Sequence, residues 1–407
     1  MYVERLFLNE FRAIASSDIQ FTHPTSPGSG SLELPNINLL VGTNGGGKST
    51  ILKGIAAAVL AGQVDLLALT GESILAWPRR GATGPCYARV TYRTGAGVGL
   101  AAGSVHEDWV QIDPEGIRHS REREPWSTRN DAIPNLFGYG PQRLTSPELR
   151  PGEALDATGR VANLFERRQE LHAPEPWLPD IGEETLTAIN ALMPPETRLT
   201  GGMQGDEVEV ESRGLRVSRT MLSDGAQSYM AWLLDLVFRL LEAGAAEDLS
   251  GVPGTVLIDE VDQRMHPRWQ QIVLRRLSDG LADLQFIGTA HSPLLAGGLR
   301  PENLTVLEPD HDAPGEGAMK ASHFEEDVYG HTADGVLTSS YFSLPSSRSE
   351  DFRQQLRRLA EAAAEMDEEA VDFIRMLAAG SAGSAGDDIR VRSELVARPD
   401  RLRRRRQ

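Results

Sequence analysis

The sequence is short of several features, and each shortage excludes a class of protein. Cys86 is the only cysteine among 407 residues, so no internal disulfide can form and a reducing compartment is expected. No apolar run approaches the length of a membrane span. The first residues also lack the basic and then apolar build of a signal peptide. Together these shortages predict a globular protein of the cytoplasm.

Lysine is scarce as well. It occurs only at Lys48, Lys53 and Lys320, and arginine supplies every other basic side chain. The net charge of −17 argues against a general polyanion-binding surface, because an acidic body is repelled by phosphate backbones. Arginines nevertheless gather in residues 401–407. We interpret this tail as solubilising charge, with a nucleic-acid or partner contact as the alternative.

What the sequence does contain is a glycine-rich segment between a predicted strand and a predicted helix. Residues 42–49 read Gly-Thr-Asn-Gly-Gly-Gly-Lys-Ser. Glycines let backbone N–H groups converge on a phosphate, and the helix N-terminus adds its positive dipole end. Lys48 is expected at the β- and γ-phosphates and Ser49 at Mg²⁺. The predicted nucleotide-binding residues are Gly42, Thr43, Asn44, Gly45, Gly46, Gly47, Lys48, Ser49 and Thr50.

A second segment ends an apolar strand with two acids. The strand is predicted at 255–258, and Asp259 and Glu260 follow it. Asp259 would hold Mg²⁺, and Glu260 would orient or deprotonate the water that attacks the γ-phosphate. Taken alone, such a strand end is commonly a solvated terminus. After the glycine-rich segment, it predicts an ATPase that hydrolyses ATP to ADP and phosphate.

A third segment stands at the start of a predicted apolar helix. Residues 222–227 read Leu-Ser-Asp-Gly-Ala-Gln, and the helix is expected at 227–243. Ser223, Asp224 and Gly225 form an anion site there through hydroxyl, N–H groups and helix dipole, and an ordinary helix cap is the alternative. One ATP needs no second helix N-terminus from its own subunit. We therefore expect these residues to act in trans, on ATP held by a partner copy.

Together these segments resemble the motifs of ABC-type P-loop ATPases in the RecF, SMC and OLD-like group. Residues 258–262 resemble the Walker B strand and D-loop, and residues 289–293 resemble the switch-histidine segment. Residues 4–14 resemble the group's opening strand, and residues 265–270 resemble its Leu-His-Pro-x-Trp-Gln stretch. The resemblance spans about residues 1–310 and extends to prokaryotic AAA-type defence ATPases such as the Septu ATPase subunit.

The resemblance also implies roles for residues outside these segments. His291 would sense the γ-phosphate as a catalytic residue, and Asp262 would lie at a dimer interface. Gln142 would be the Q-loop residue, both catalytic and a metal ligand, with Arg143 as the alternative. Arg12 is a further candidate to approach the nucleotide. The implied cofactors are ATP and Mg²⁺, and the implied working unit is a head-to-tail homodimer that sandwiches two ATP molecules.

The fold expected from this resemblance is α/β, with a mixed P-loop sheet and helices on both faces. Residues 1–65 would open the ATPase core, and residues 66–132 would form a β-rich insertion lobe. Residues 133–318 would carry the Q-loop, a helical lobe, the signature, Walker B and the switch histidine. Residues 319–407 would form a helical region with the basic tail. Further strands are expected at 3–8, 37–41, 87–92, 109–112, 133–139, 207–210, 215–217 and 284–289.

Four functions fit this sequence. The leading hypothesis is the ATP-driven sensor or regulatory subunit of an anti-phage defence complex, paired with a separately encoded nuclease. The alternatives are a stand-alone DNA-repair ATPase of the RecF type, the nucleotide-binding subunit of a transporter, and an ATP-gated scaffold without hydrolysis. DNA is a further partner under the first two. The acidic turn at 325–327 is interpreted as solvated rather than as a nuclease metal site.

Overall fold

The computed structural model describes residues 1–26, 28, 30, 32–61, 66, 69, 74–82, 84–95, 103–113, 116–119, 135–146, 159–165, 170–313 and 317–364. Contacts divide the chain into two compact units, Met1–Ser343 and Leu344–Gln407. The described part of the second unit contains one helix, α10 Glu350–Ala364. The rest of the helical region that the sequence predicts, residues 365–407 with the basic tail, lies outside the described residues.

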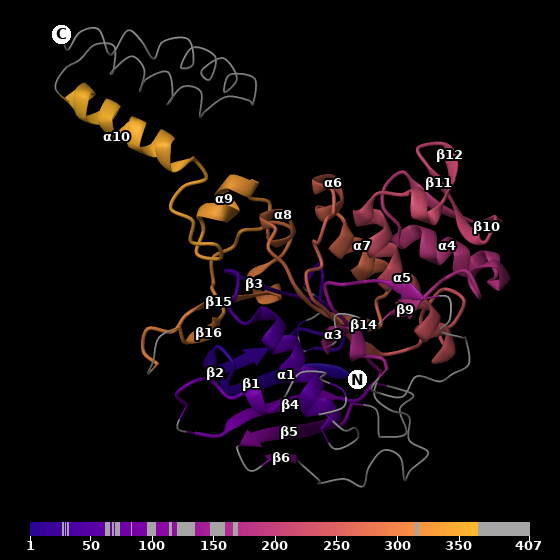
Figure 1. Ribbon diagram of the computed structural model, residues 1–407, viewed down its shortest axis with the longest axis horizontal. Coiled ribbons are helices and arrows are strands. Elements are labelled where there is room, and N and C mark those ends of the chain that lie inside the picture. The colour runs from indigo at the N-terminus through magenta and orange to yellow at the C-terminus, as the bar shows by residue number, and fades with distance from the viewer. Residues whose placement is uncertain are drawn as a thin grey trace. The chain divides into compact units, whose positions relative to one another are not determined.

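A mixed sheet of 11 strands runs through the first unit, as the sequence predicted (Figure 1). Its strand order is β6-β5-β4-β1-β2-β16-β15-β3-β14-β13-β7. The strands are β1 Tyr2–Phe11, β2 Ile14–Gln20, β3 Ile37–Gly42, β4 Cys86–Arg93, β5 Val105–Asp113, β6 Gly116–His119, β7 Leu136–Tyr139, β13 Gly254–Ile258, β14 Leu284–Thr289, β15 Leu304–Pro309 and β16 Met319–Ser322.

Parallel and antiparallel strands occupy different parts of this sheet. Strands β15, β3, β14, β13 and β7 run parallel, and β1, β2, β4, β5 and β6 pair antiparallel. The parallel strands β13 and β14 are buried at every position, whereas β4 alternates between buried and half-buried residues. This is the pattern expected of a parallel core covered on both faces. Because β4 pairs with β1, the strands expected in an insertion lobe extend the main sheet.

The sheet separates two hydrophobic cores. Side chains of α1 Lys48–Leu60 belong to one core, and those of α5 Asp224–Glu242 belong to the other. Strand β3 sends Leu40 into the core of α1, and Leu39 and Val41 into the core of α5. The two helices therefore cover opposite faces, since successive strand residues point to opposite sides.

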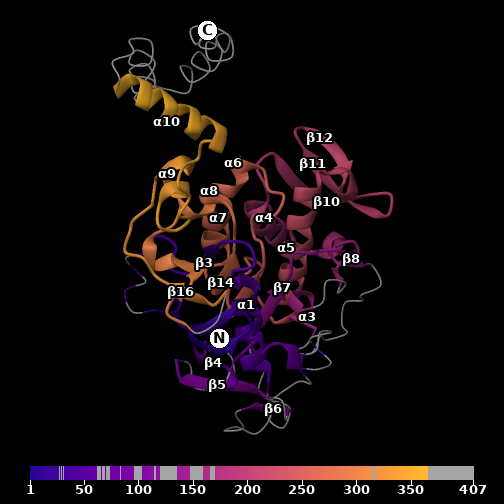
Figure 2. The same cartoon turned by 60° about the vertical axis from the view of Figure 1, so that its left-hand side comes forward.

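Further helices and a small sheet surround α5. In both views α4, α5, α7 and β10 to β12 gather at one end, away from β4, β5 and β6 (Figure 1, Figure 2). The three strands β10, β11 and β12 form a separate antiparallel sheet, which includes the hairpin that the sequence predicted at 207–217. The remaining elements of the first unit are η2 Ile74–Ala76, β8 Thr145–Ser146, α3 Ala162–Phe165, β9 Leu171–His172, η3 Leu178–Asp180, α4 Glu183–Leu192, β10 Thr197–Gln204, β11 Glu207–Ser212, β12 Leu215–Ser218, η4 Arg219–Met221, α6 Pro267–Gln270, α7 Val273–Gly280, α8 Pro293–Ala296, η5 Pro301–Asn303 and α9 Ala333–Thr338.

The segment that begins at residue 319 differs from its prediction. It opens as strand β16, which pairs with β15 and β2 in the main sheet, rather than as part of a helical region. Its four residues are too few to predict a strand from their pattern alone, and the pairing with β2 joins Met319 to Ile14 across about 300 residues of chain. In the described ranges, no helix is both long and apolar enough to span a membrane.

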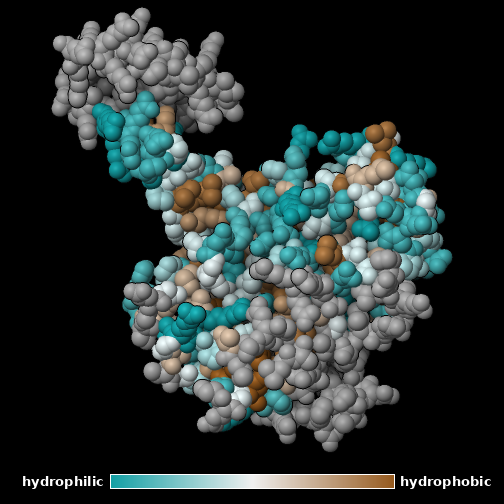
Figure 3. Space-filling view, in the orientation of Figure 1, coloured by the Kyte–Doolittle hydropathy of each residue, from teal (hydrophilic) through white to brown (hydrophobic). Residues whose placement is uncertain are grey.

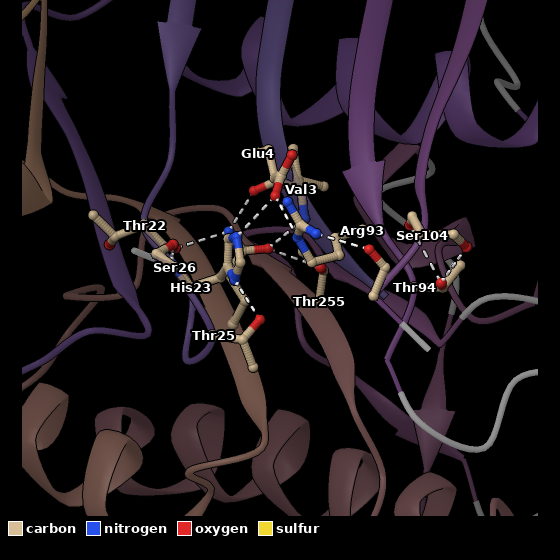
Figure 4. A network of polar contacts seen from close by, with 12 residues as sticks. Val3, Glu4, Thr22, His23, Thr25, Ser26, Arg93, Thr94, Ser104 and Thr255 are labelled. Carbon is tan, nitrogen blue, oxygen red and sulfur yellow. Dashed lines mark hydrogen bonds and ion pairs between the residues drawn. The ribbon is translucent and has the colours of Figure 1, made fainter. Parts of the chain in front are cut away.

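A buried polar cluster joins the antiparallel and parallel parts at the N-terminal ends of β13 and β14 (Figure 4). The Gln285 side-chain carbonyl accepts hydrogen bonds from Val3 N at 2.7 Å and Thr255 Oγ1 at 3.0 Å. Its amide nitrogen donates to Val3 O at 2.7 Å and Thr22 O at 2.9 Å. We call these four residues the Gln285 clamp. Beside it, Glu4 contacts both His23 and Arg93.

Candidate ATP site

The glycine-rich loop lies between β3 and α1, where the sequence placed it. Gly42 ends the strand with φ +138°, and a Cβ there would lie 2.5 Å from the backbone oxygen of Leu307 in β15. Gly47 caps the helix with φ +96°. Other residue types rarely adopt such angles, so both positions require glycine for the loop to close. Residues 43–45 are exposed, Thr50 is buried and Ser49 is half-buried at the start of α1.

Lys48 lies beneath this loop. Its ammonium donates to Gly42 O at 2.8 Å and to Thr43 O at 3.0 Å. Burial lowers the pKa of Lys48, and the nearby carboxylates of Asp259, Asp262 and Glu260 offset part of that effect. A buried ammonium at a glycine-rich loop is suited to a bound polyphosphate.

The two Walker B acids follow β13, and the neighbouring strands hold their backbone. The Asp259 N–H donates to Tyr139 O of β7 at 2.8 Å. On the other side, Thr289 Oγ1 of β14 donates to Asp259 Oδ1 at 2.6 Å and accepts from Glu260 N at 2.7 Å. Glu260 has φ +51°, a left-handed conformation that non-glycine residues seldom adopt. Within the described part of the chain, its carboxylate has no hydrogen-bond partner. The sequence pattern places Thr289 in the switch segment but does not predict its contacts with the two acids.

The structure separates the two Q-loop candidates. The Gln142 side chain is exposed, and its backbone oxygen accepts from Asn163 Nδ2 at 2.9 Å. Arg143 is buried, and its Nη2 donates to Asp259 O at 2.8 Å and to Glu260 O at 3.0 Å. The contact to the Walker B acids therefore comes from Arg143, the alternative Q-loop residue, and not from the Gln142 side chain. The role of Gln142 as a metal ligand stays a prediction.

The switch segment follows β14 at the same edge of the sheet. The His291 side chain is exposed, and its backbone N–H donates to Asp262 Oδ2 at 2.9 Å. Asp262 thus contacts the switch segment of its own chain, and its place at a dimer interface stays a prediction. The alanine that precedes the histidine, Ala290, is fully buried.

The signature residues form the start of α5. Ser223 is the N-cap and accepts from Ala226 N at 3.4 Å, so the helix-cap reading is confirmed. Gly225 is buried, and a Cβ there would lie 2.0 Å from Arg264 O. This glycine is required because the loop packs against the turn after Walker B. Ser223 and Asp224 stay exposed, and Asp224 pairs with Arg264 at 3.4 Å.

A buried ionic cluster connects α5 to β7, and the sequence reading missed it. Asp235 is fully buried and accepts from Tyr139 Oη at 2.9 Å, His172 Nδ1 at 2.7 Å and Arg239 Nε at 2.6 Å. Burial raises the pKa of Asp235. The charge of Arg239 and the hydrogen bonds from His172 outweigh this effect and lower the pKa to about 2. The available signal was an aspartate and an arginine four residues apart in an otherwise apolar helix.

The remaining candidates have structural contacts. Arg12 lies over the ring of Trp77 at 5.6 Å, and Trp77 is a core residue. In the acidic turn, Asp327 pairs with Arg300 at 2.7 Å and Glu326 accepts from Ser340 N at 2.9 Å. In the ranges that the structure covers, no three His, Cys, Asp or Glu side chains form a group that could hold a metal ion.

Comparison with solved structures supports this fold. An SMC head bound to the C-terminal winged-helix domain of ScpA matches with a TM-score of 0.51 and 16% identity, over 80% of this chain and 98% of that one. An Smc head with an extended coiled coil, bound to a ScpA domain derived from Pyrococcus furiosus, matches with a TM-score of 0.51 and 14% identity, over 79% and 96%. At such identities the likeness concerns the fold alone.

Curated relatives of this chain come from bacteria. The chain is 25% identical to the Septu protein PtuA of Bacillus mycoides (strain KBAB4) over 350 residues, which is 84% of this chain and 45% of the relative. It is 35% identical to the Retron Ec83 probable ATPase of Escherichia coli over 101 residues, 24% of this chain and 18% of the relative. The chain thus spans less than half the length of these relatives.

A family match covers half of the chain. The family is described as "AAA domain, putative AbiEii toxin, Type IV TA system", and the match extends over residues 93–297. It includes Asp259, Glu260 and His291, and the glycine-rich loop precedes it. Because this match covers half of the chain, the chain belongs to this AAA-domain family.

Proposed function

We propose that residues 42–50 bind ATP and that Glu260 orients the water that attacks its γ-phosphate. The observation that carries this proposal is the geometry of Glu260. Its backbone is held from β14 by Thr289 and from the β7 side by Arg143, while its carboxylate is half-exposed and has no partner in the described part of the chain. A rigid backbone with a free carboxylate suits a general base or water-orienting residue.

The other groups of the site complete the proposed chemistry. Backbone N–H groups of the loop and the Lys48 ammonium would neutralise the phosphates. Ser49 and Asp259 fit a Mg²⁺ ion, because Thr289 occupies only Oδ1 of the carboxylate and Mg²⁺ prefers one or two protein oxygens beside phosphate and water. When bound, the ion would supply charge stabilisation to the phosphates. His291 is exposed and available to a γ-phosphate at the same edge.

The dimer belongs to the same proposal. Ser223 and Asp224 are exposed at a helix N-terminus, which suits contact with ATP bound by a second copy. Two apolar side chains are exposed beside the proposed contact segments, Met221 at 71% near the signature and Leu144 at 60% near the Q-loop. Figure 3 shows that the visible face of the first unit is otherwise mainly hydrophilic, with apolar residues in small patches. A dimer that covered these two side chains would remove their apolar surface from water.

We also propose that the ATPase serves an anti-phage defence complex and acts on a separately encoded nuclease. The support is the similarity to a Septu protein and to a retron ATPase, both of the defence-associated kind. Co-purification with a nuclease encoded beside this chain is the expected result. Strong stimulation of hydrolysis by DNA without any such partner would favour the RecF-type alternative instead.

Replacing Glu260 by glutamine tests the ATP site. We expect phosphate release to fall by about 100-fold or more, while a fluorescent ATP analogue still binds. The variant should also accumulate as an ATP-bound dimer in size-exclusion chromatography, because separation would need hydrolysis. Hydrolysis at the parental rate would refute the assignment of Glu260, and a variant that stays monomeric with bound ATP would refute the dimer.

A further inference from the structure

Arg143 is a buried arginine that lies directly against the Walker B acids. It follows β7 in the segment after Gly140, and its Nε donates to Gly140 O at 3.2 Å. Its Nη2 donates to the backbone oxygens of Asp259 and Glu260 at 2.8 and 3.0 Å. One planar guanidinium therefore connects the end of β7 to two consecutive carbonyls beyond the end of β13.

Folding stability alone does not explain an arginine at this position. Arg143 is 7% exposed, and its Nη1 is enclosed without a hydrogen-bond partner in the described part of the chain. Burial lowers the pKa of Arg143 to about 10, although Asp259, Glu260 and Asp262 raise it in part. The guanidinium lies 6.0 Å from the ring centre of Trp232. A buried cation with an unpaired donor carries a desolvation cost, and its hydrogen bonds to carbonyl groups offset only part of that cost.

What Arg143 does explain is the conformation of Glu260. At φ +51°, Glu260 has a backbone conformation that is unfavourable for its residue type and needs external contacts to persist. Thr289 holds the N–H of Glu260, and Arg143 holds its C=O. The same guanidinium holds Asp259 O, so the peptide between the two acids has a fixed orientation. That orientation sets the direction in which the Glu260 side chain leaves the backbone.

We propose that Arg143 is a positioning residue of the ATPase reaction, which aims the Glu260 carboxylate through the backbone carbonyls of Asp259 and Glu260. This inference rests on the proposed ATP site, since it assigns Arg143 a task only if Glu260 orients water. Arg143 would change the rate of the chemical step and leave nucleotide binding by the glycine-rich loop intact.

The test is Arg143→Met, with Arg143→Lys as the conservative variant. We expect the methionine variant to lower kcat by about 10- to 100-fold, because small errors in the placement of a catalytic group have effects of that size. KM and the affinity for a fluorescent ATP analogue should stay within about twofold of the parent, since the loop contacts are unchanged. The lysine variant should recover part of kcat, because its ammonium can donate to both carbonyls without the planar fork.

Arg160→Met is the matched control. Arg160 is also poorly exposed to solvent, lies 5.9 Å from the ring centre of Phe137 in β7, and contacts Asn135 rather than the acids. This variant should keep kcat within about twofold of the parent, whatever it does to the thermal midpoint. A parental kcat in Arg143→Met would overturn the inference, as would an equal loss of kcat and ATP affinity. If the methionine variant does not fold, Arg143→Leu takes its place, and a parental kcat in that variant overturns the inference.

The Glu260→Gln variant separates the two possible failures. If Glu260→Gln is inactive and Arg143→Met hydrolyses ATP like the parent, only the role of Arg143 is wrong. If Glu260→Gln keeps the parental rate, the proposed ATP chemistry is wrong whatever the Arg143 variants do.

Discussion

Polar residues gather at both ends of β13 and β14, and their hydrogen bonding differs between the two ends. At the N-terminal ends, Gln285 uses both donors and both acceptor positions of its amide in the clamp. At the C-terminal ends, Glu260 keeps a free carboxylate within the described structure, and Arg143 keeps an unpaired Nη1. Lys48 donates only to carbonyls of its own loop.

Backbone conformation follows the same division. Glu260 and Arg264, which follow β13, have positive φ, and Gly42 and Gly47 of the loop do too. Among the clamp residues Val3, Thr22, Thr255 and Gln285, none has a positive φ. A fully satisfied polar network stabilises the fold, whereas unsatisfied groups and strained residues persist where function requires them. The cluster with unpaired groups and positive φ angles is therefore the one that we associate with ATP chemistry.

Removing the Lys48 ammonium from the C-terminal ends of β13 and β14 should have the largest effect on ATP hydrolysis. We expect Lys48→Ala to reduce kcat/KM for ATP by about 100- to 1000-fold, because a preorganised charge at the phosphates is lost. The thermal midpoint without nucleotide should stay the same or rise, since burial already disfavours this ammonium, as the lowered pKa of Lys48 shows. Phosphate release and a thermal melt measure the two effects. A large loss of stability would contradict the division between the two ends.

Removing the Gln285 amide from the clamp should have the opposite result, which is a loss of stability without a loss of kcat. Gln285→Leu leaves the N–H of Val3, the hydroxyl of Thr255 and the oxygens of Val3 and Thr22 without this partner. We expect the free energy of unfolding to fall by about 2–4 kcal/mol, measured in urea. Below the unfolding transition, kcat should stay within about twofold of the parent. A selective loss of kcat would show that the clamp also takes part in the reaction.

A smaller effect is expected where the signature loop packs on the turn after Walker B. In Gly225→Ala the new Cβ would meet Arg264 O, so the two segments must separate. We expect a loss of about 1–3 kcal/mol in the free energy of unfolding. Gly182→Ala is the matched control at the start of α4, because its nearest contact is 3.9 Å away. An equal loss in both variants would remove the assigned reason for Gly225.

The smallest expected effect is the pH dependence of folding stability that comes from His23, beside the Gln285 clamp. Burial lowers the pKa of His23, and Glu4 offsets this only in part. The folded state therefore binds a proton less readily than the unfolded state, and stability falls as the pH drops below the ordinary histidine pKa of 6.5. His23→Gln should flatten the decline in the free energy of unfolding between about pH 7 and 5. Urea titrations at each pH would measure the slope, and an identical slope in both proteins would disprove this assignment.

Local patterns predicted much of the fold. Strand β14 has the predicted bounds of 284–289, and β13 differs by one residue from the predicted 255–258. Helix α5 begins three residues before its expected start, because Asp224 and Gly225 were assigned to a loop before the helix. Elements with strong apolar runs were therefore predicted well, and their ends less so.

Contacts between distant segments could not be predicted in the same way. The pattern within a strand can predict the strand but not its partner, as in the pairing of β4 with β1 and of β16 with β2. The same holds for Asp235, whose partners lie 63 and 96 residues away along the chain. Such pairs depend on which elements become neighbours in the sheet and its covering helices.

The sequence by itself determined the chemistry that this edge of the sheet can perform. Only glycines can close the loop at Gly42 and Gly47, and only a lysine and acids at those spacings suit a phosphate and a metal ion. The tertiary structure decided which side chains orient that chemistry. It brought Thr289 and Arg143 to the two sides of Glu260, because β14 and β7 are the two neighbours of β13 in the sheet. Strand order is a property of the whole fold, and no local pattern contains it.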